Sequence, residues 1–183
     1  MNSRDLCLMP YLNRALETGA VSLKIEGRMK SAHYVGTVVN AYRRALDACL
    51  TGSFSKSVSD GLLNELKKTS HRAFTSGFLF GKDFDETENF FTSKAVADGN
   101  FVASVLDWSD GVAAVEMRNR FFEGDELEVV EPGKKPYKLV VEDLYNLDDD
   151  EKVDVANKAT DTYSFKCDKP VSSDAIFRRQ RTE

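Results

Sequence analysis

The fold is decided by a short stretch near the N-terminus, Val21-Ser22-Leu23-Lys24-Ile25-Glu26-Gly27-Arg28-Met29-Lys30-Ser31 (residues 21–31). Its first six residues alternate apolar and polar side chains, which is the period of a β-strand with one buried face. Gly27 interrupts the alternation, and a helical period begins near Ser31. Strands that end in charged residues and lead into a helix carry the catalytic groups of α/β barrels. We therefore expect a strand over 21–26, which needs partner strands on both sides.

Helices are expected before and after this strand. The first covers about 10–18 and ends at Gly19. The second covers about 31–50 and carries apolar residues at three- and four-residue spacing, namely Val35, Val38, Val39, Tyr42, Leu46 and Cys49. Residues 1–51 therefore predict a helix–strand–helix unit, the remnant of an α/β (TIM-like) barrel, too small to close a parallel sheet by itself.

The rest of the chain changes character twice. Residues 52–61 are rich in Ser and Gly, and we interpret 52–72 as a linker with a short helix over about 62–68. From residue 73 onward, short alternating runs recur about every ten residues. Strands are expected at 78–80, 101–106, 112–117, 126–129, 137–141 and 163–167, with turns at 109–111, 123–125, 132–133 and 148–151. Residues 73–183 thus predict a small antiparallel β-barrel or a sandwich, of which we take the barrel, and the fold class is α+β.

Composition limits the class of protein. The chain has 183 residues, of which 42% are hydrophobic and 30% charged, as in soluble globular proteins of one or two domains. No apolar run approaches the roughly 20 residues that span a bilayer, and nothing at the N-terminus resembles a signal peptide. Three widely spaced cysteines are no disulfide framework, so a cytoplasmic location is expected.

Charge is distributed unevenly along the chain. Residues 1–72 hold 11 Lys and Arg against 6 Asp and Glu, a net of +5. Residues 73–183 hold 14 against 24, a net of −10. The second part should therefore repel a phosphate backbone, whereas the first part is compatible with an anionic ligand.

Several motifs resemble the collagenase-like peptidase family U32, whose catalytic type is unassigned. They are Asn2–Cys7, Ser22–Ser31, Tyr34-Val35, Ala41–Asp47, Ser70–Phe78, Val115–Phe121 and Gly124–Glu128. The run from Lys24 to Ser31 is the most specific of them. The resemblance covers the last portion of the family's N-terminal α/β barrel and its C-terminal domain, a β-barrel of the translation-factor type.

This resemblance implies two kinds of activity for a longer parent protein. Some members are labelled proteases, that is, hydrolases. Others take part in oxygen-independent hydroxylation of tRNA, ribosomal RNA or a quinone precursor, which depends on prephenate for the two RNAs, and hold a [4Fe-4S] cluster with four cysteines. Cys7 matches the fourth cluster cysteine. One thiolate cannot hold a cluster, so we expect this chain alone to bind no stoichiometric iron and to be inactive.

The candidate catalytic residues are Lys24, Glu26 and Arg28. The two cations can clamp a carboxylate or phosphate while Glu26 accepts a proton or orients a cation. The alternative is an ion-pair network that only stabilises a barrel mouth. His33 and His71 have no Ser, Cys or Asp at the spacing of a known triad, and no zinc-protease motif is present.

Three readings of function remain open from the sequence. In the first, the parent is an enzyme acting on a macromolecule, protein or structured RNA, which the β-barrel helps to position. In the second, the β-barrel is an accessory module that binds protein or RNA without chemistry, and its acidity favours protein. The third is the protease of the family's label. An unpaired strand and the apolar stripe of the long helix would also favour a homo-oligomer, and no membrane partner is expected.

Overall fold

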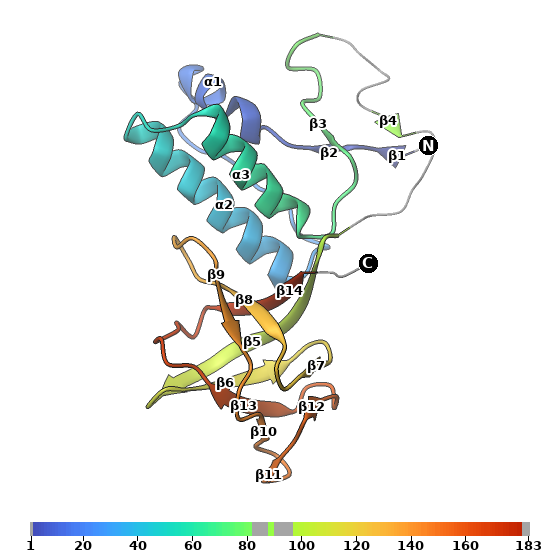
Figure 1. The fold of residues 1–183 in the computed structure, drawn as a ribbon. Helices are drawn as coiled ribbons and strands as arrows, with labels where there is room; N and C mark the ends of the chain where they lie inside the picture. The colour runs from blue at the N-terminus through green and yellow to red at the C-terminus, as the bar shows by residue number, and fades with distance from the viewer. Residues whose placement is uncertain (1, 82–87, 90–96, 181–183) are drawn as a thin grey trace. The chain divides into compact units, whose positions relative to one another are not determined.

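A computed structural model of the chain describes residues 2–81, 88–89 and 97–180 (Figure 1). The chain divides into two units, Met1–Asp98 and Gly99–Glu183. Three helices lie in the first unit and an eight-stranded antiparallel sheet in the second, so the predicted α+β class is confirmed. None of the helices in the described ranges is both long and apolar enough to cross a membrane.

The first unit contains short strands around a group of helices. Its elements are β1 (Asn2–Ser3), β2 (Asp5–Leu6), the 3-10 turn η1 (Met9–Tyr11), α1 (Leu12–Glu17), α2 (Ala32–Leu50), α3 (Lys56–Lys67), β3 (Phe74–Thr75) and β4 (Glu88–Asn89). Strand β2 pairs with β3 in parallel, and β1 pairs with β4 antiparallel.

Helices α1 and α2 follow the predicted pattern closely. Gly19 follows α1 with φ +81°, a left-handed conformation that glycine adopts without strain. Ser31 caps α2, since its side-chain oxygen accepts a hydrogen bond from the backbone N–H of Tyr34 at 3.3 Å. Both predicted helices are therefore confirmed.

The buried face of α2 differs from the predicted stripe. Val38, Ala41 and Ala45 are buried in a core that also takes in Leu62 and Leu66 of α3. Of the predicted stripe, Val35 and Val39 are exposed. The buried face thus includes small residues that the apolar pattern alone does not mark, because α3 and η1 pack closely against this side of the helix group.

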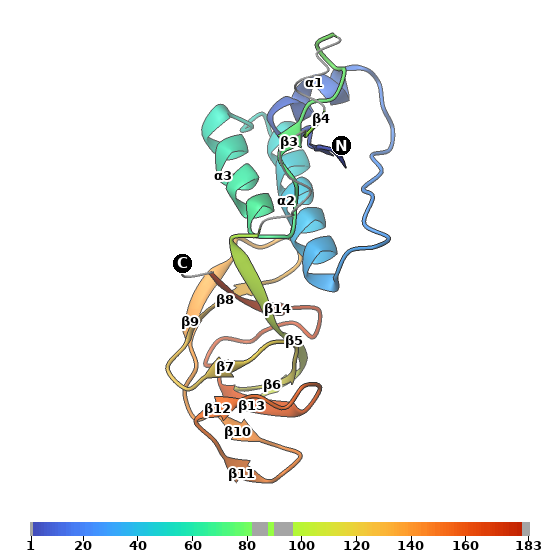
Figure 2. The same ribbon diagram turned by 90° about the vertical axis from the view of Figure 1, so that its right-hand side faces the viewer.

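The predicted strand over 21–26 is not formed. This stretch runs as irregular extended chain between α1 and α2 (Figure 2). Val21 is fully exposed, and Leu23 and Ile25 are also exposed. The alternation of side chains is real, but the described residues provide no neighbouring strand to pair with it. The helix–strand–helix remnant is therefore a group of helices with an unpaired extended segment.

The predicted linker is mostly helical. Helix α3 begins at Lys56 because the side chain of Ser55 accepts a hydrogen bond from Val58 N–H at 3.3 Å. The Ser-rich composition at 55–59 is thus the start of a helix rather than flexible chain. The stretch after α3 also belongs to the first unit, because β3 pairs with β2 and Phe74 packs against the first core. This grouping differs from the boundary at residue 72 that composition suggested.

The second unit is built from ten strands. They are β5 (Gly99–Ser109), β6 (Val112–Met117), β7 (Phe121–Phe122), β8 (Glu126–Val130), β9 (Tyr137–Val140), β10 (Tyr145–Asn146), β11 (Glu151–Lys152), β12 (Val155–Ala156), β13 (Thr162–Lys166) and β14 (Ile176–Gln180). Eight of them form one sheet in the order β11-β10-β13-β6-β5-β14-β8-β9, and β12 pairs with β7.

This sheet is a half-barrel rather than the closed barrel that was predicted. Each of its edge strands, β11 and β9, has one paired neighbour in the described chain. Strands β5 and β6 form a hairpin whose central residues, Asp110 and Gly111, both have positive φ (48° and 82°). An Asp-Gly pair favours this tight turn because its twist matches that of the flanking strands. The predicted turn at 109–111 is therefore confirmed.

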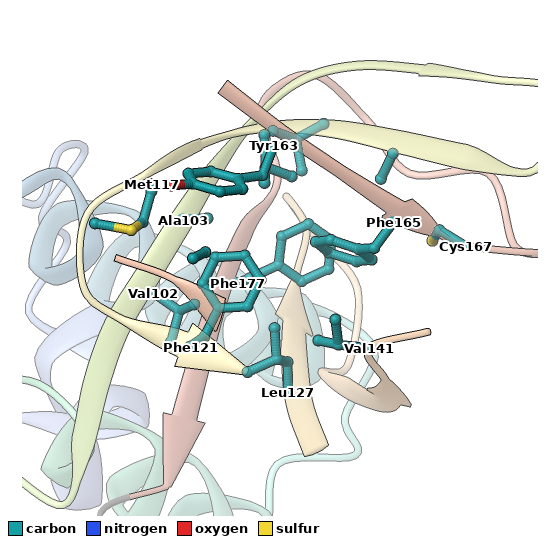
Figure 3. Packing of buried hydrophobic residues seen from close by; sticks show 14 of the residues in the cluster. Val102, Ala103, Met117, Phe121, Leu127, Val141, Tyr163, Phe165, Cys167 and Phe177 are labelled. Carbon is teal, nitrogen blue, oxygen red and sulfur yellow. The ribbon is translucent and has the colours of Figure 1, made fainter. Parts of the chain in front are cut away.

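A dense apolar core fills the concave side of the half-barrel (Figure 3). The rings of Phe121, Phe165 and Phe177 meet edge-to-face, with centroids 6.1 Å apart for Phe121–Phe165 and 5.1 Å for Phe165–Phe177. The sequence predicts that Phe90-Phe91 and Phe121-Phe122 lie in a core rather than on an exposed contact surface. Phe121 is buried as predicted, but Phe122 is exposed, so the prediction is wrong for Phe122. Phe90-Phe91, also expected in a core, lie outside the described residues.

One strand prediction fails in the first unit, and one strand of the second unit was not predicted, for different reasons. Residues 78–80 lie in a turn and are exposed, because an apolar run without alternation or a partner does not by itself make a strand. Strand β14 was missed, although it lies between β5 and β8 near the centre of the sheet. Its sequence ends in Arg178-Arg179-Gln180, and charged residues do not signal a central strand.

Candidate functional site

The first unit contains a cavity of about 620 Å³ between β2, the extended stretch 23–26 and α2. Its lining includes apolar side chains such as Leu12, Val38 and Leu66. It also includes the charged groups discussed below, which together are called the polar wall. A volume of this size lies within the roughly 300–1,000 Å³ of small-ligand sites.

The pairing of β2 with β3 brings distant motifs together at this cavity. Backbone N–H groups of Asp5 and Cys7 donate to the carbonyls of Ala73 and Thr75 at 3.0 and 2.9 Å. The carboxylate of Asp5 then accepts hydrogen bonds from Arg72, at 3.0 Å from its backbone N–H and 2.9 Å from Nε. The N-terminal and the 70–75 motifs thereby form one wall.

Arg72 and Lys30 both affect the ionisation of Asp5. Partial burial by itself raises the pKa of this carboxyl. The hydrogen bonds from Arg72 and the positive charges of Arg72 and Lys30 together outweigh burial, and the pKa is lowered below its ordinary value. Asp5 is therefore held as an anion and fixes the position of Arg72.

Lys30 ties the end of the extended stretch to the same wall. Its Nζ donates to the carbonyl of Ser70 at 2.8 Å and lies 4.9 Å from the centroid of the Tyr34 ring. The stretch from residue 23 to 30 is thus attached at its C-terminal end, although it forms no strand.

Cys7 lies beside Tyr42, and both residues line the cavity. Its Sγ is 3.7 Å from the Tyr42 hydroxyl oxygen, which also accepts a hydrogen bond from Leu8 N–H at 3.2 Å. Burial raises the pKa of the Cys7 thiol and the pKa of the Tyr42 hydroxyl. Cys7 is consequently a protonated thiol near neutral pH.

The predicted catalytic residues are only partly brought together. Lys24 and Glu26 line the cavity, with 3.9 Å between Lys24 Nζ and Glu26 Oε2, and both side chains are largely exposed. Arg28 does not line the cavity, but its backbone N–H donates to Glu26 Oε1 at 3.1 Å. Two of the three residues thus share one cavity with Cys7.

Cations outnumber carboxylates on the cavity wall. Five lining residues are basic, namely Arg4, Lys24, Lys30, Arg43 and Arg72, against the two acidic residues Asp5 and Glu26. Arg4 also lines a smaller adjacent cavity of about 270 Å³, as do Cys7 and Phe74. The site is therefore suited to a ligand that carries negative charge.

The donor set around Cys7 does not fit an iron–sulfur cluster, which requires about four thiolates. No three His, Cys, Asp or Glu side chains among the described residues are grouped as metal ligands. Cys49 lies at the end of α2, and Cys167 belongs to the second unit. Cys7 alone cannot hold the cluster that the resemblance implies.

The histidines do not form a protease site at this cavity. His71 Nδ1 lies 2.7 Å from the carbonyl oxygen of Arg72, and its ring stacks on Phe74 with centroids 4.4 Å apart. His33 is buried on α2. Of the described residues that line the large cavity, none is His or Ser.

Sequence reasoning did not single out Arg4, Asp5, Tyr42 or Arg72 as site residues. Asp5 and Arg72 each stood in a recognised motif, but 67 positions separate them. Only the β2–β3 pairing makes them neighbours. The sequence offered one signal for this contact: both the Asp-Leu-Cys motif and the Ser-His-Arg motif resemble the same family.

Comparison with known sequences identifies both parts of the chain. Residues 1–89 match peptidase family U32, and residues 98–178 match the peptidase family U32 C-terminal domain. The C-terminal domain of a Geobacillus thermoleovorans protein assigned to the U32 peptidases is a solved structure that covers 44% of this chain and 99% of its own. Its identity is 28% and its TM-score 0.41.

Several similar proteins have names that describe an activity. The tRNA hydroxylation protein P1 of Bacillus subtilis (strain 168) is 32% identical over 98% of this chain and 43% of its own length. The tRNA hydroxylation protein P of Escherichia coli (strain K12) is 37% identical over 72% of this chain and 29% of its own.

A collagenase of Porphyromonas gingivalis (strain ATCC BAA-308 / W83) is more distant. It is 26% identical over 72% of this chain and 33% of its own length. This chain therefore spans less than half of the length of each of these three relatives. Matches to both family domains together cover nearly all of the 183 residues, and the chain belongs to peptidase family U32.

Proposed function

We propose that this chain is part of a tRNA hydroxylation protein and that the cavity of the first unit contacts the RNA. The observation that carries the proposal is the excess of five basic over two acidic residues on the cavity wall, next to Tyr34, Tyr42 and Phe74. Cations that bind phosphate and aromatic rings that stack on bases are the usual means of contacting unpaired RNA. The names of the Bacillus subtilis and Escherichia coli relatives support the same activity.

The chemistry of the cavity disfavours the alternative, proteolysis. A cysteine protease needs a thiolate, and burial raises the pKa of Cys7 instead of lowering it. A serine protease needs a paired base, and the described residues that line the large cavity include neither Ser nor His. We therefore place the collagenase reading second.

Lys24, Glu26 and Arg28 would have the roles that the sequence suggested, although Arg28 does not line the cavity. In a longer protein, Lys24 and Arg28 would bind an anionic group, and Glu26 would accept a proton or orient a cation. Cys7 would supply one cluster ligand, and the other three would have to come from beyond the residues described here.

The second unit would have a supporting role. Residues 99–183 contain 12 Lys and Arg against 19 Asp and Glu, a net charge of −7. Such a surface repels phosphate groups, so contact with protein is favoured over contact with RNA. This unit would act as an accessory module without chemistry of its own.

A chimeric protein tests the proposed activity. In an Escherichia coli strain that lacks its tRNA hydroxylation protein P, the segment similar to this chain is replaced by this chain. The cells are grown without oxygen, and nucleosides from bulk tRNA are analysed by mass spectrometry. We expect the hydroxylated nucleoside to return, and Glu26→Gln to reduce it to the level of the deletion strain. Glu17→Gln, an exposed residue at the end of α1, is the matched control and should have no effect.

The same chimera can also contradict the proposed function. A stable chimera that leaves tRNA unmodified yet cleaves denatured collagen would contradict the proposal. Cleavage that is insensitive to chelators and abolished by Glu26→Ala would support the protease reading instead.

A further inference from the structure

We propose, building on the proposed contact with RNA, that Arg4 binds the phosphate of a single unstacked nucleotide whose base enters the larger cavity. Arg4 lies on the wall shared by both cavities of the first unit. This assigns a binding role to a residue outside the predicted set of Lys24, Glu26 and Arg28.

Arg4 differs from the other basic residues of the wall because its side chain has no partner among the described residues. Its Nε is buried and makes no hydrogen bond. The structure gives the Arg4 side chain no hydrogen bond or ion pair with any described residue. A buried guanidinium N–H without a partner is unfavourable, and an oxyanion that accepts from it removes this cost.

The remaining four cations are already engaged. Arg72 is bound to Asp5, and Lys30 to the carbonyl of Ser70. Arg43 is paired with Asp47 at 2.5 Å, and Lys24 lies near Glu26. Their charges still attract an anion to the cavity, but Arg4 has the hydrogen-bonding capacity to hold one.

The lining of the cavity favours a nucleotide over a small inorganic anion. Tyr34, Tyr42 and Phe74 contribute aromatic surface, and a phosphate alone would leave the apolar part of the lining without contacts. A volume of about 620 Å³ has room for a base with its ribose. Enzymes that modify a base take it out of the stack, so one nucleotide is the natural unit to bind.

The test uses the whole 183-residue chain labelled with ¹⁵N. The Nε–H signal of Arg4 is followed by NMR during titration with each of the four nucleoside 5′-monophosphates. Separate titrations use the four nucleosides, inorganic phosphate and succinate. We expect the Arg4 signal to shift with at least one monophosphate. That monophosphate should bind at least about tenfold more tightly than the corresponding nucleoside or inorganic phosphate. These two comparisons separate the contributions of base and phosphate.

A matched pair of variants identifies the residue. Arg4→Gln should weaken binding of the monophosphate by about tenfold or more, the loss expected for one charge-assisted hydrogen bond. Arg44→Gln removes the same charge from α2 at a position that does not line the cavity, and should leave binding unchanged. Far-UV circular dichroism establishes that both variants are folded.

Three outcomes would overturn the proposal. They are an Arg4 signal that no monophosphate shifts, a folded Arg4→Gln variant that binds as tightly as the original chain, and succinate bound more tightly than every monophosphate. None of them requires hydroxylation activity. A chimera that hydroxylates tRNA while Arg4→Gln has no effect on nucleotide binding would refute the role of Arg4 and leave the proposed function intact.

Discussion

Asp5 shows how a single residue organises the cavity wall. Its carboxylate binds Arg72, at 2.8 Å from Nη2 as well as through Nε and the backbone N–H. Cys7 follows two positions later on the same extended segment. Loss of this carboxylate would therefore loosen the contact between the N-terminal segment and residues 70–75.

Replacement of Asp5 by Asn should make the free energy of unfolding depend less on pH in the acidic range. Folding lowers the pKa of Asp5, so the unfolded chain binds more protons below about pH 4. The stabilisation is complete above the unfolded pKa and is lost as the pH falls through the folded one. We expect Asp5→Asn to cost about 1 kcal/mol at pH 7, since solvent partly screens the pair, and much less at pH 3. Urea unfolding followed by circular dichroism at both pH values measures the difference.

Asp60→Asn serves as the control for this experiment. Asp60 is paired with Lys56 on the exposed surface of α3, and such pairs contribute at most about 0.5 kcal/mol. An Asp5→Asn cost that is the same at pH 3 as at pH 7 would contradict the assigned role of the carboxylate.

Individual site residues were partly predictable from sequence. Lys24, Glu26 and Cys7 were named from their motifs, and all three line the same cavity. Arg4, Asp5 and Arg72 were not named, because their significance depends on which backbone segments pair. Pairing of two-residue strands is set by the surrounding tertiary structure and leaves no periodic signal.

At the level of elements, the extended stretch 21–26 is the clearest difference between pattern and structure. Its alternation predicts a strand, but a strand exists only with a hydrogen-bonded neighbour. The structure provides no backbone hydrogen-bond partner for the amides of 21–26 among the described residues. The sequence of 21–26 is thus suited to pairing with a neighbouring strand, but it pairs with no strand among the described residues.

Amide hydrogen exchange measures directly whether residues 21–26 are paired. We expect the amides of 21–26 to exchange at close to intrinsic rates, while those in the middle of α2 are strongly protected. Slow exchange in 21–26 would contradict the extended, unpaired conformation. Should that protection also disappear on dilution, the partner strand would come from a second copy of the chain.

Ser55, the N-cap of α3, is a second difference at this level, because the Ser-rich composition around it predicted a linker. We expect Ser55→Ala to lower the free energy of unfolding by about 1 kcal/mol, because the N–H of Val58 loses its acceptor. Ser57 is the second residue of the helix, and Ser57→Ala should cause no loss, since Ala is the better helix former. Thermal unfolding at 222 nm compares the two, and equal effects would show that Ser55 is no cap.

On the scale of the whole molecule, the second unit has what it needs to fold independently. Its buried cluster consists entirely of residues between Val102 and Phe177. The single tryptophan, Trp108, lies in β5 and donates from Nε1 to the Cys167 carbonyl at 2.8 Å, so its fluorescence reports on this unit alone.

We expect residues 97–183 produced alone to show the Trp108 emission maximum and urea midpoint of the whole chain. Phe121→Ala should lower the stability of both by about 3–5 kcal/mol, because its ring is fully buried in the core. Phe122→Ala, at the exposed neighbouring position, should cost far less. An unfolded fragment would contradict this independence.

The overall class and most strands were predictable because turns and alternation are local signals. The Asp110-Gly111 hairpin and the strands on either side of it are the clearest case. Closure of the sheet was not predictable, because an open half-barrel and a closed barrel have the same alternation along each strand. The central strand β14 was hidden by Arg178, whose burial depends on its pairing with Glu128 at 2.7 Å.

The decisive measurement is tRNA binding by the 183-residue chain and, in parallel, by folded residues 97–183, at about 50 mM and about 200 mM salt. A cationic RNA site in the first unit predicts that the whole chain binds tRNA, and that affinity falls with salt by a log–log slope of about −0.7 to −0.9 for each phosphate contacted. It also predicts that the acidic second unit does not bind. Absence of binding by the whole chain at the lower salt, or equal affinity of residues 97–183, would contradict it.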